Sequence, residues 1–115
     1  RQNRVPSEEW IVNYNDYIGQ DPWMIPFWWD VLLEKDAFKR AIKTRWEQIR
    51  GTQLTNELLI QTIEQQAQYL QANLAIARNY GRWNGISVNY NAAVDELKSW
   101  VLQRATWMDS KISTF

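Results

Sequence analysis

Apolar residues recur at intervals of three and four along most of the chain after residue 35, which predicts α-helix. The first long stripe predicts a helix that follows Asp36 as its N-cap and ends at Arg50, with Gly51 just beyond. Its other face carries charged residues, so this helix should bury one side only. The apolar positions of this stripe are Phe38, Ile42, Trp46 and Ile49.

Two further stripes predict longer helices. One helix should span residues 56–80, capped by Thr55 and stopped by Gly81, and residues 81–89 should form a loop. The other should span residues 90–112, with Asn89 or Asn91 as its cap. The two stripes are Leu59, Ile63, Ala67, Leu70, Leu74 and Ala77, and then Val94, Leu97, Val101, Ala105, Met108 and Ile112.

The first third of the chain has a different pattern. Residues 1–22 mix turn formers with large apolar side chains such as Trp10, which indicates an irregular strap packed over a core. Pro26 favours the start of a short helix over residues 26–34. The chain therefore predicts an all-α fold, an up-down helical bundle of one short and three longer helices with an irregular N-terminal strap. We expect residues 1–115 to form a single helical domain.

The amino-acid composition excludes several classes of function. The chain has 13 basic and 13 acidic residues, so no basic field favours nucleic acid. It has no cysteine and no histidine, which excludes disulfides, thiolate zinc sites and histidine-based triads. No apolar run is long enough for a membrane span, and no signal peptide is visible. Since the chain begins without Met, we expect it to be a fragment or a processed form.

The candidates for acid–base chemistry are carboxylates. General acid–base catalysis needs two such groups that converge with separated pKa values, and their spacing here does not force convergence. No phosphate-binding glycine loop and no calcium loop occurs, so we expect no cofactor and no metal ligand in this chain. The carboxylates are therefore predicted to be solvated. They are Glu34, Asp36, Asp95, Glu96 and Asp109.

The eight tryptophans are the least usual feature of the composition. One helical turn separates Arg104 from both Trp100 and Trp107. We expect its guanidinium to stack on an indole of its own helix and to bond loop carbonyls or a carboxylate. The alternative is an exposed aromatic platform for sugars or a cell-surface partner. The candidate aromatic and cationic cluster is Arg82, Trp83, Trp100, Arg104 and Trp107.

Four blocks of sequence, in order, carry a family resemblance. Residues 21–38 read DPWMIPFWWDVLLEKDAF, residues 43–50 read KTRWEQIR, residues 78–83 read RNYGRW, and residues 97–109 read LKSWVLQRATWMD. Together they resemble the C-terminal portion of the CotH kinase family, named after spore coat protein H. The resemblance spans about residues 10–115.

The resemblance implies an atypical protein kinase as parent, with ATP and magnesium bound by residues upstream of this stretch. This chain would be the C-terminal fragment of a larger CotH-like domain, a non-catalytic helical part whose partner is the upstream kinase-like core of the same chain. The protein substrate is not indicated. Resemblance to exported bacterial members favours an extracytoplasmic or cell-surface location. The alternatives are an aromatic-rich binding module for glycans or a cell-surface partner, and a structural domain of an inactive relative.

Overall fold

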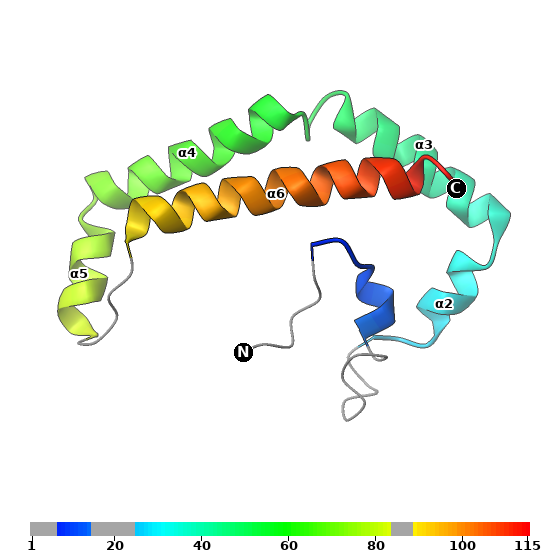
Figure 1. The fold of residues 1–115 in the computed structure, drawn as a ribbon, viewed down its shortest axis with the longest axis horizontal. Helices are drawn as coiled ribbons and strands as arrows, with labels where there is room; N and C mark the ends of the chain where they lie inside the picture. The colour runs from blue at the N-terminus through cyan, green and yellow to red at the C-terminus, as the bar shows by residue number, and fades with distance from the viewer. Residues whose placement is uncertain (1–6, 15–24, 84–88) are drawn as a thin grey trace.

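A computed structural model of the chain describes residues 7–14, 25–83 and 89–115 (Figure 1). Within these ranges all regular structure is helical, which confirms the all-α class. The bounds of the short helix and of the last helix agree closely with the prediction. The elements are η1 (Ile11–Asn13), α2 (Trp28–Leu33), α3 (Asp36–Arg50), α4 (Asn56–Ala72), α5 (Ala75–Arg82) and α6 (Tyr90–Ile112).

Helix α6 is the element that organises the fold. α3 and α4 follow one another along its length and both run antiparallel to it (Figure 1). Near α4, Lys98 of α6 bonds Glu64. Toward the other end, Lys43 of α3 bonds the carbonyl of Ser113 just beyond α6. The expected antiparallel packing is therefore present, with α6 as the shared partner of the two earlier helices.

The N-cap residues in the structure can be compared with the predicted ones. The side chain of Asn89 accepts a hydrogen bond from the Ala92 N–H at 3.1 Å, and Thr55 accepts one from the Leu58 N–H at 3.2 Å, so both caps are confirmed. The prediction for Asp36 is wrong by one position. Lys35 occupies the N-cap without a side-chain bond, and Asp36 is the first helical residue. A carboxylate there still suits the positive end of the helix dipole.

The predicted helix over residues 56–80 is wrong, because the chain breaks into α4 and α5. Leu74 adopts a left-handed conformation with φ of 56°, and the side chain of Asn73 bonds back to the Tyr69 carbonyl at 2.8 Å. Gly81, the predicted stop, lies inside α5. The apolar residues keep their helical spacing across the break, so their periodicity does not indicate where α4 ends. As a result α5 turns away from the line of α4 (Figure 1).

Leu74→Gly is expected to stabilise the fold slightly, by about 0.5 kcal/mol, because glycine adopts a positive φ without the left-handed penalty of a leucine. The Leu74 side chain is 64% exposed, so little packing is lost. Urea unfolding followed by far-UV circular dichroism measures the change. The matched control is Gln65→Gly in regular helix, which should destabilise by about 1 kcal/mol. Destabilisation by both variants would contradict the assigned backbone at Leu74.

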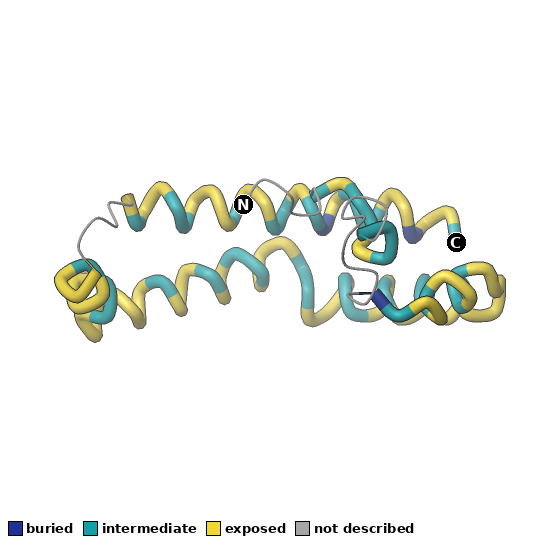
Figure 2. The backbone as a smooth tube through the Cα atoms, turned by 90° about the horizontal axis from the view of Figure 1, so that it is seen from below, coloured by how far each residue is buried: buried dark blue, intermediate teal, exposed yellow. Residues whose placement is uncertain are grey.

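The described residues contain very little fully buried core. Only Ile25, Ala105 and Ile112 are buried among the hydrophobic residues, and most of α3, α4 and α6 is exposed or half-buried (Figure 2). The Cα envelope measures 51 × 38 × 18 Å, so its thinnest dimension is little more than that of two packed helices. Large apolar side chains consequently reach solvent on several helices.

The N-terminal strap is expected from the sequence to be irregular over residues 1–22 and to pack on a core. Its described part, residues 7–14, contains η1 and packs on α6 through Trp10. The rest of the predicted strap, and residues 84–88 of the predicted loop, lie outside the described residues. No helix in the described ranges has both the length and the apolar character needed to cross a membrane.

Candidate functional site

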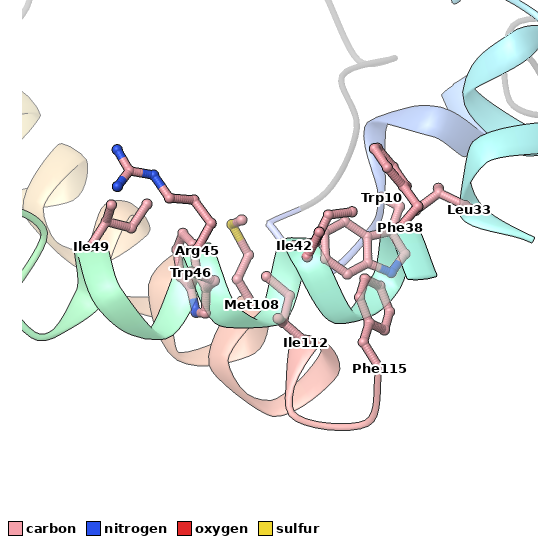
Figure 3. Close-up of a pocket in the computed structure, with 11 residues that line it drawn as sticks. Trp10, Leu33, Phe38, Ile42, Arg45, Trp46, Ile49, Met108, Ile112 and Phe115 are labelled. Atoms are coloured by element: carbon pink, nitrogen blue, oxygen red, sulfur yellow. The ribbon is translucent and has the colours of Figure 1, made fainter. Parts of the chain in front are cut away.

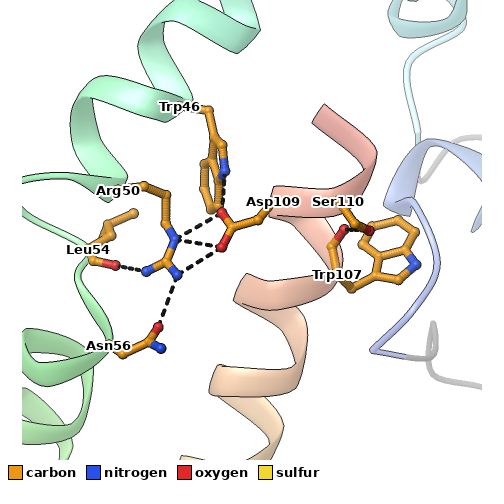
Figure 4. A network of polar contacts seen from close by, with 7 residues as sticks. All are labelled: Trp46, Arg50, Leu54, Asn56, Trp107, Asp109 and Ser110. Carbon is orange, nitrogen blue, oxygen red and sulfur yellow. Dashed lines mark hydrogen bonds and ion pairs between the residues drawn. The ribbon is translucent and has the colours of Figure 1, made fainter. Parts of the chain in front are cut away.

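A polar cluster joins α3 to α6, and we call its three residues, Trp46, Arg50 and Asp109, the α3–α6 clamp (Figure 4). Arg50 donates from Nε and Nη2 to the two carboxylate oxygens of Asp109, each at 2.9 Å. The Trp46 indole N–H donates to the same carboxylate at 2.8 Å. These contacts span about sixty residues of sequence, so they fix how the two helices are placed relative to each other.

Arg50 also fastens the turn that follows α3. Its remaining donors bond the Leu54 carbonyl and the Asn56 side chain, the latter at 3.0 Å (Figure 4). One guanidinium therefore holds the end of α3, the turn and the start of α4 against α6. Such a planar, forked donor set is a property of arginine that lysine lacks.

The electrostatics of the clamp favour its charged form. Hydrogen bonds from Arg50 lower the pKa of Asp109 below its ordinary value, with burial opposing the shift and Trp46 adding to it. The hydrogen bond with Asp109 in turn raises the pKa of Arg50. A carboxylate held in this way stays ionised at neutral pH and has no tendency to act as a general acid.

The other predicted carboxylates do not gather around the clamp. Asp95 lies 3.4 Å from Lys98 on α6, and Lys98 also pairs with Glu64 of α4 at 2.9 Å. Within the described ranges, no three acidic side chains meet where they could hold a metal ion.

A second cluster joins the strap to α6, and we call Trp10, Arg104 and Trp107 the strap cluster. The Arg104 guanidinium carbon lies 4.7 Å from the centroid of the Trp107 ring and 5.9 Å from that of Trp10. The two indoles meet edge to face, with centroids 4.7 Å apart. Arg104 Nη1 donates to the carbonyls of Ser7, at 2.8 Å, and Glu9. The expected stacking of Arg104 on its own helix and its bonds to loop carbonyls are thus confirmed.

The five residues predicted as one cluster do not form one. Arg104 and Trp107 meet, whereas Arg82 and Trp83 lie at the end of α5 and pair with each other at 5.7 Å. Trp100 stands apart on α6, 46% exposed. The sequence did not show that Trp10 of the strap completes the Arg104 stack, since nothing in local spacing links residues nearly a hundred positions apart.

An apolar pocket of about 440 Å³ lies between α3 and the end of α6, beneath Trp10 of the strap (Figure 3). A smaller one, of about 210 Å³, adjoins it around Trp46, Met108 and Trp100. Both are lined by apolar side chains and by the stems of arginines, so they suit hydrophobic side chains. The larger pocket is lined by Trp10, Leu33, Phe38, Ala41, Ile42, Arg45, Trp46, Ile49, Met108, Ile112 and Phe115.

Arg104→Lys is expected to lower the free energy of unfolding by about 1 kcal/mol, because lysine keeps the charge and loses the planar stack on Trp107 and the paired carbonyl bonds. Thermal melts followed by circular dichroism measure the loss. Arg45→Lys, at an exposed position on α3, is the matched control and should stay within about 0.5 kcal/mol. Equal melts for the two variants would contradict a structural role for Arg104.

Comparison with known proteins agrees with the four sequence blocks. A family model described as CotH kinase protein matches residues 3–108, which is most of the chain. No curated protein and no solved structure matches. Trp46 and Arg50 of the α3–α6 clamp and Arg104 and Trp107 of the strap cluster lie within the matched residues, and Asp109 directly follows them.

Proposed function

Because this chain belongs to the CotH kinase family, we propose that it is the non-catalytic helical part of a CotH-like atypical protein kinase. In this role it supports the kinase-like core of the same protein, which would bind ATP and magnesium and transfer phosphate to a protein substrate. The chain itself contributes rigidity and a packing surface. An extracytoplasmic or cell-surface setting is part of the same proposal.

The observation that carries this proposal is how the polar residues of the family blocks are used. Arg50, Asp109 and Trp46 satisfy one another across two helices. Arg104 directs its donors at backbone carbonyls of the strap. Residues that act on a substrate need free donors, acceptors or protons that face an open site. In this chain the donors and acceptors of these residues bond other elements of the fold and do not face an open site.

Catalysis provides the test. The 115-residue chain, incubated with magnesium or manganese and radiolabelled ATP, is expected to show neither ATP hydrolysis nor phosphotransfer. The full-length protein that carries it should keep its KM for ATP within about twofold in the Asp109→Asn variant, while its melting temperature falls. Phosphotransfer by the chain alone would contradict the proposal. So would loss of turnover in an Asp109→Asn protein that melts like the parent.

The two alternatives predict different results in simple assays. A glycan-binding module would bind sugars through Trp100 or Trp83, and binding by the chain alone would support it. A structural domain of an inactive relative would leave the full-length protein unable to bind ATP. The clamp contacts favour a supporting role over glycan binding, because sugar recognition pairs an aromatic face with free polar groups.

A further inference from the structure

The junction between α4 and α5 holds a leucine in an unfavourable backbone conformation. Among the described residues, Leu74 is the only one other than glycine with a positive φ, and its φ and ψ are 56° and 19°. Contacts between Cβ and the backbone disfavour this conformation for leucine, so it persists only where other interactions hold it. The Leu74 side chain is 64% exposed, so its own packing does not supply those interactions.

Local hydrogen bonds hold the bend. The Asn73 side chain donates to the Tyr69 carbonyl at 2.8 Å, and Arg78 Nη2 donates to the Asn73 carbonyl at 2.8 Å. The Leu74 N–H bonds the Gln71 carbonyl, three residues back, where a regular α-helix would use the carbonyl four residues back. The two side-chain bonds lie at exposed positions, where water competes with them. The bend is therefore held mainly by short-range bonds at the surface.

The apolar pattern of the sequence favours a different form of the same segment. Leu70, Leu74 and Ala77 keep helical spacing across the junction, as they would in one continuous helix. In that helix the N–H groups of residues 74–77 would bond the carbonyls of residues 70–73. In the bent form Leu74 is the N-cap of α5 and its side chain caps no N–H group. The bent form thus has its own local bonds and lacks those of a regular helix.

We propose that α4 and α5 form a two-state hinge, in which the bent form exchanges with a continuous helix over residues 56–82. The Asn73 carbonyl marks the difference, because it accepts from Arg78 in the bent form and from the Ala77 N–H in the continuous helix. Straightening releases Leu74 from its left-handed conformation and breaks the local bonds. These two effects oppose each other, so both forms are populated.

The hinge changes where the end of α5 lies. α5 packs on α4, and at its far end the exposed Arg82 lies 5.7 Å from the ring of Trp83. Since α5 has eight residues, straightening moves this cation–aromatic pair by about 10 Å relative to α6. The seven residues 83–89 join α5 to α6, and a segment of that length can span about 23 Å, so the connection permits the movement.

The chain has no cysteine, so introduced pairs of thiols can carry spin labels without background. The test pair is Gln65→Cys on α4 with Asn79→Cys on α5, and the control pair is Glu96→Cys with Ser110→Cys on α6. All four positions are exposed, and the two members of each pair are fourteen residues apart, which is about 21 Å along a continuous helix. Pulsed electron spin resonance of the 115-residue chain measures both distance distributions.

The test pair is expected to show two distances, one near 21 Å and one shorter, whereas the control pair shows only the distance near 21 Å. Leu74→Gly should remove the longer component, because glycine tolerates the left-handed conformation and disfavours a continuous helix. Asn73→Ala should increase the longer component by about twofold, because alanine favours helix and removes the side-chain bond to the Tyr69 carbonyl.

Three results would overturn the inference. A single short distance for the test pair, in the parent and in Asn73→Ala alike, would show that the bend is rigid. A single distance near 21 Å in both would show that α4 and α5 are one helix. A longer component that Leu74→Gly leaves unchanged would show that the movement does not occur at Leu74. The hinge is independent of the proposed function, because these distances are measured without ATP or substrate.

Discussion

Replacing Asp109 with alanine is expected to lower the free energy of unfolding by about 2–3 kcal/mol, one of the two largest effects of any single change in this chain. The substitution leaves Arg50 half-buried without its carboxylate and removes the acceptor of the Trp46 indole. The Asp109 side chain is 41% exposed, so solvent reduces the loss below that of a fully buried ion pair. Urea unfolding of the purified protein measures it.

The pH dependence of stability tests the contribution of the clamp independently. The pKa of Asp109 is lowered in the folded state from an ordinary value of 3.8, so folding favours the ionised form. Its contribution is therefore complete above that value and is lost as pH falls through the lowered pKa. Asp109→Asn should therefore reduce the loss of stability that the protein shows as pH falls. An Asp109→Asn variant that loses stability at acid pH as the parent does would contradict the clamp.

Trp46→Ala is expected to cost about 3 kcal/mol, at the low end for a tryptophan because Trp46 is half-buried between two pockets. The loss combines the packing of the indole against Met108 with the hydrogen bond to Asp109. Trp46→Phe separates the two terms, because it keeps most of the packing and removes the donor. It should cost about 1 kcal/mol.

The control for Trp46 is Trp83, which is 56% exposed at the end of α5. Trp83→Ala removes a cation–π contact with Arg82 and little packing, so it should cost less than about 1 kcal/mol. Thermal melts of the three variants show the order of their losses of stability. Similar losses for Trp46→Ala and Trp83→Ala would show that Trp46 is a surface residue and not an anchor of α3 on α6.

The helices could be predicted from the sequence where local signals agree with one another. Asn89 caps a continuous apolar stripe, and α6 occupies residues 90–112 as expected. α3 ends at Arg50, just before Gly51. The break at Leu74 could not be predicted in this way, since leucine rarely adopts a positive φ and the stripe continues through it. The break coincides with the hydrogen bond from the Asn73 side chain to the Tyr69 carbonyl at the end of α4.

The candidate site was only partly predictable for a similar reason. The contact of Arg104 with Trp107 lies within one helical turn and follows from spacing. The Trp46–Arg50–Asp109 contacts depend on how α3 and α6 pack, and neither helix alone indicates its partner. The prediction of a solvated carboxylate at Asp109 is therefore wrong, because Asp109 accepts four hydrogen bonds across the interface. Family membership pointed to these blocks, and the structure shows what holds them together.

The central claim is that residues of the family blocks hold the helices together, and a double-mutant cycle on Arg50 and Asp109 tests it most directly. The free energy of unfolding is measured for the parent, Arg50→Ala, Asp109→Ala and the double variant. The clamp predicts that the double variant loses about 1–2 kcal/mol less than the sum of the single losses. Losses that simply add would show that the two side chains do not stabilise the fold through each other, and would contradict this account.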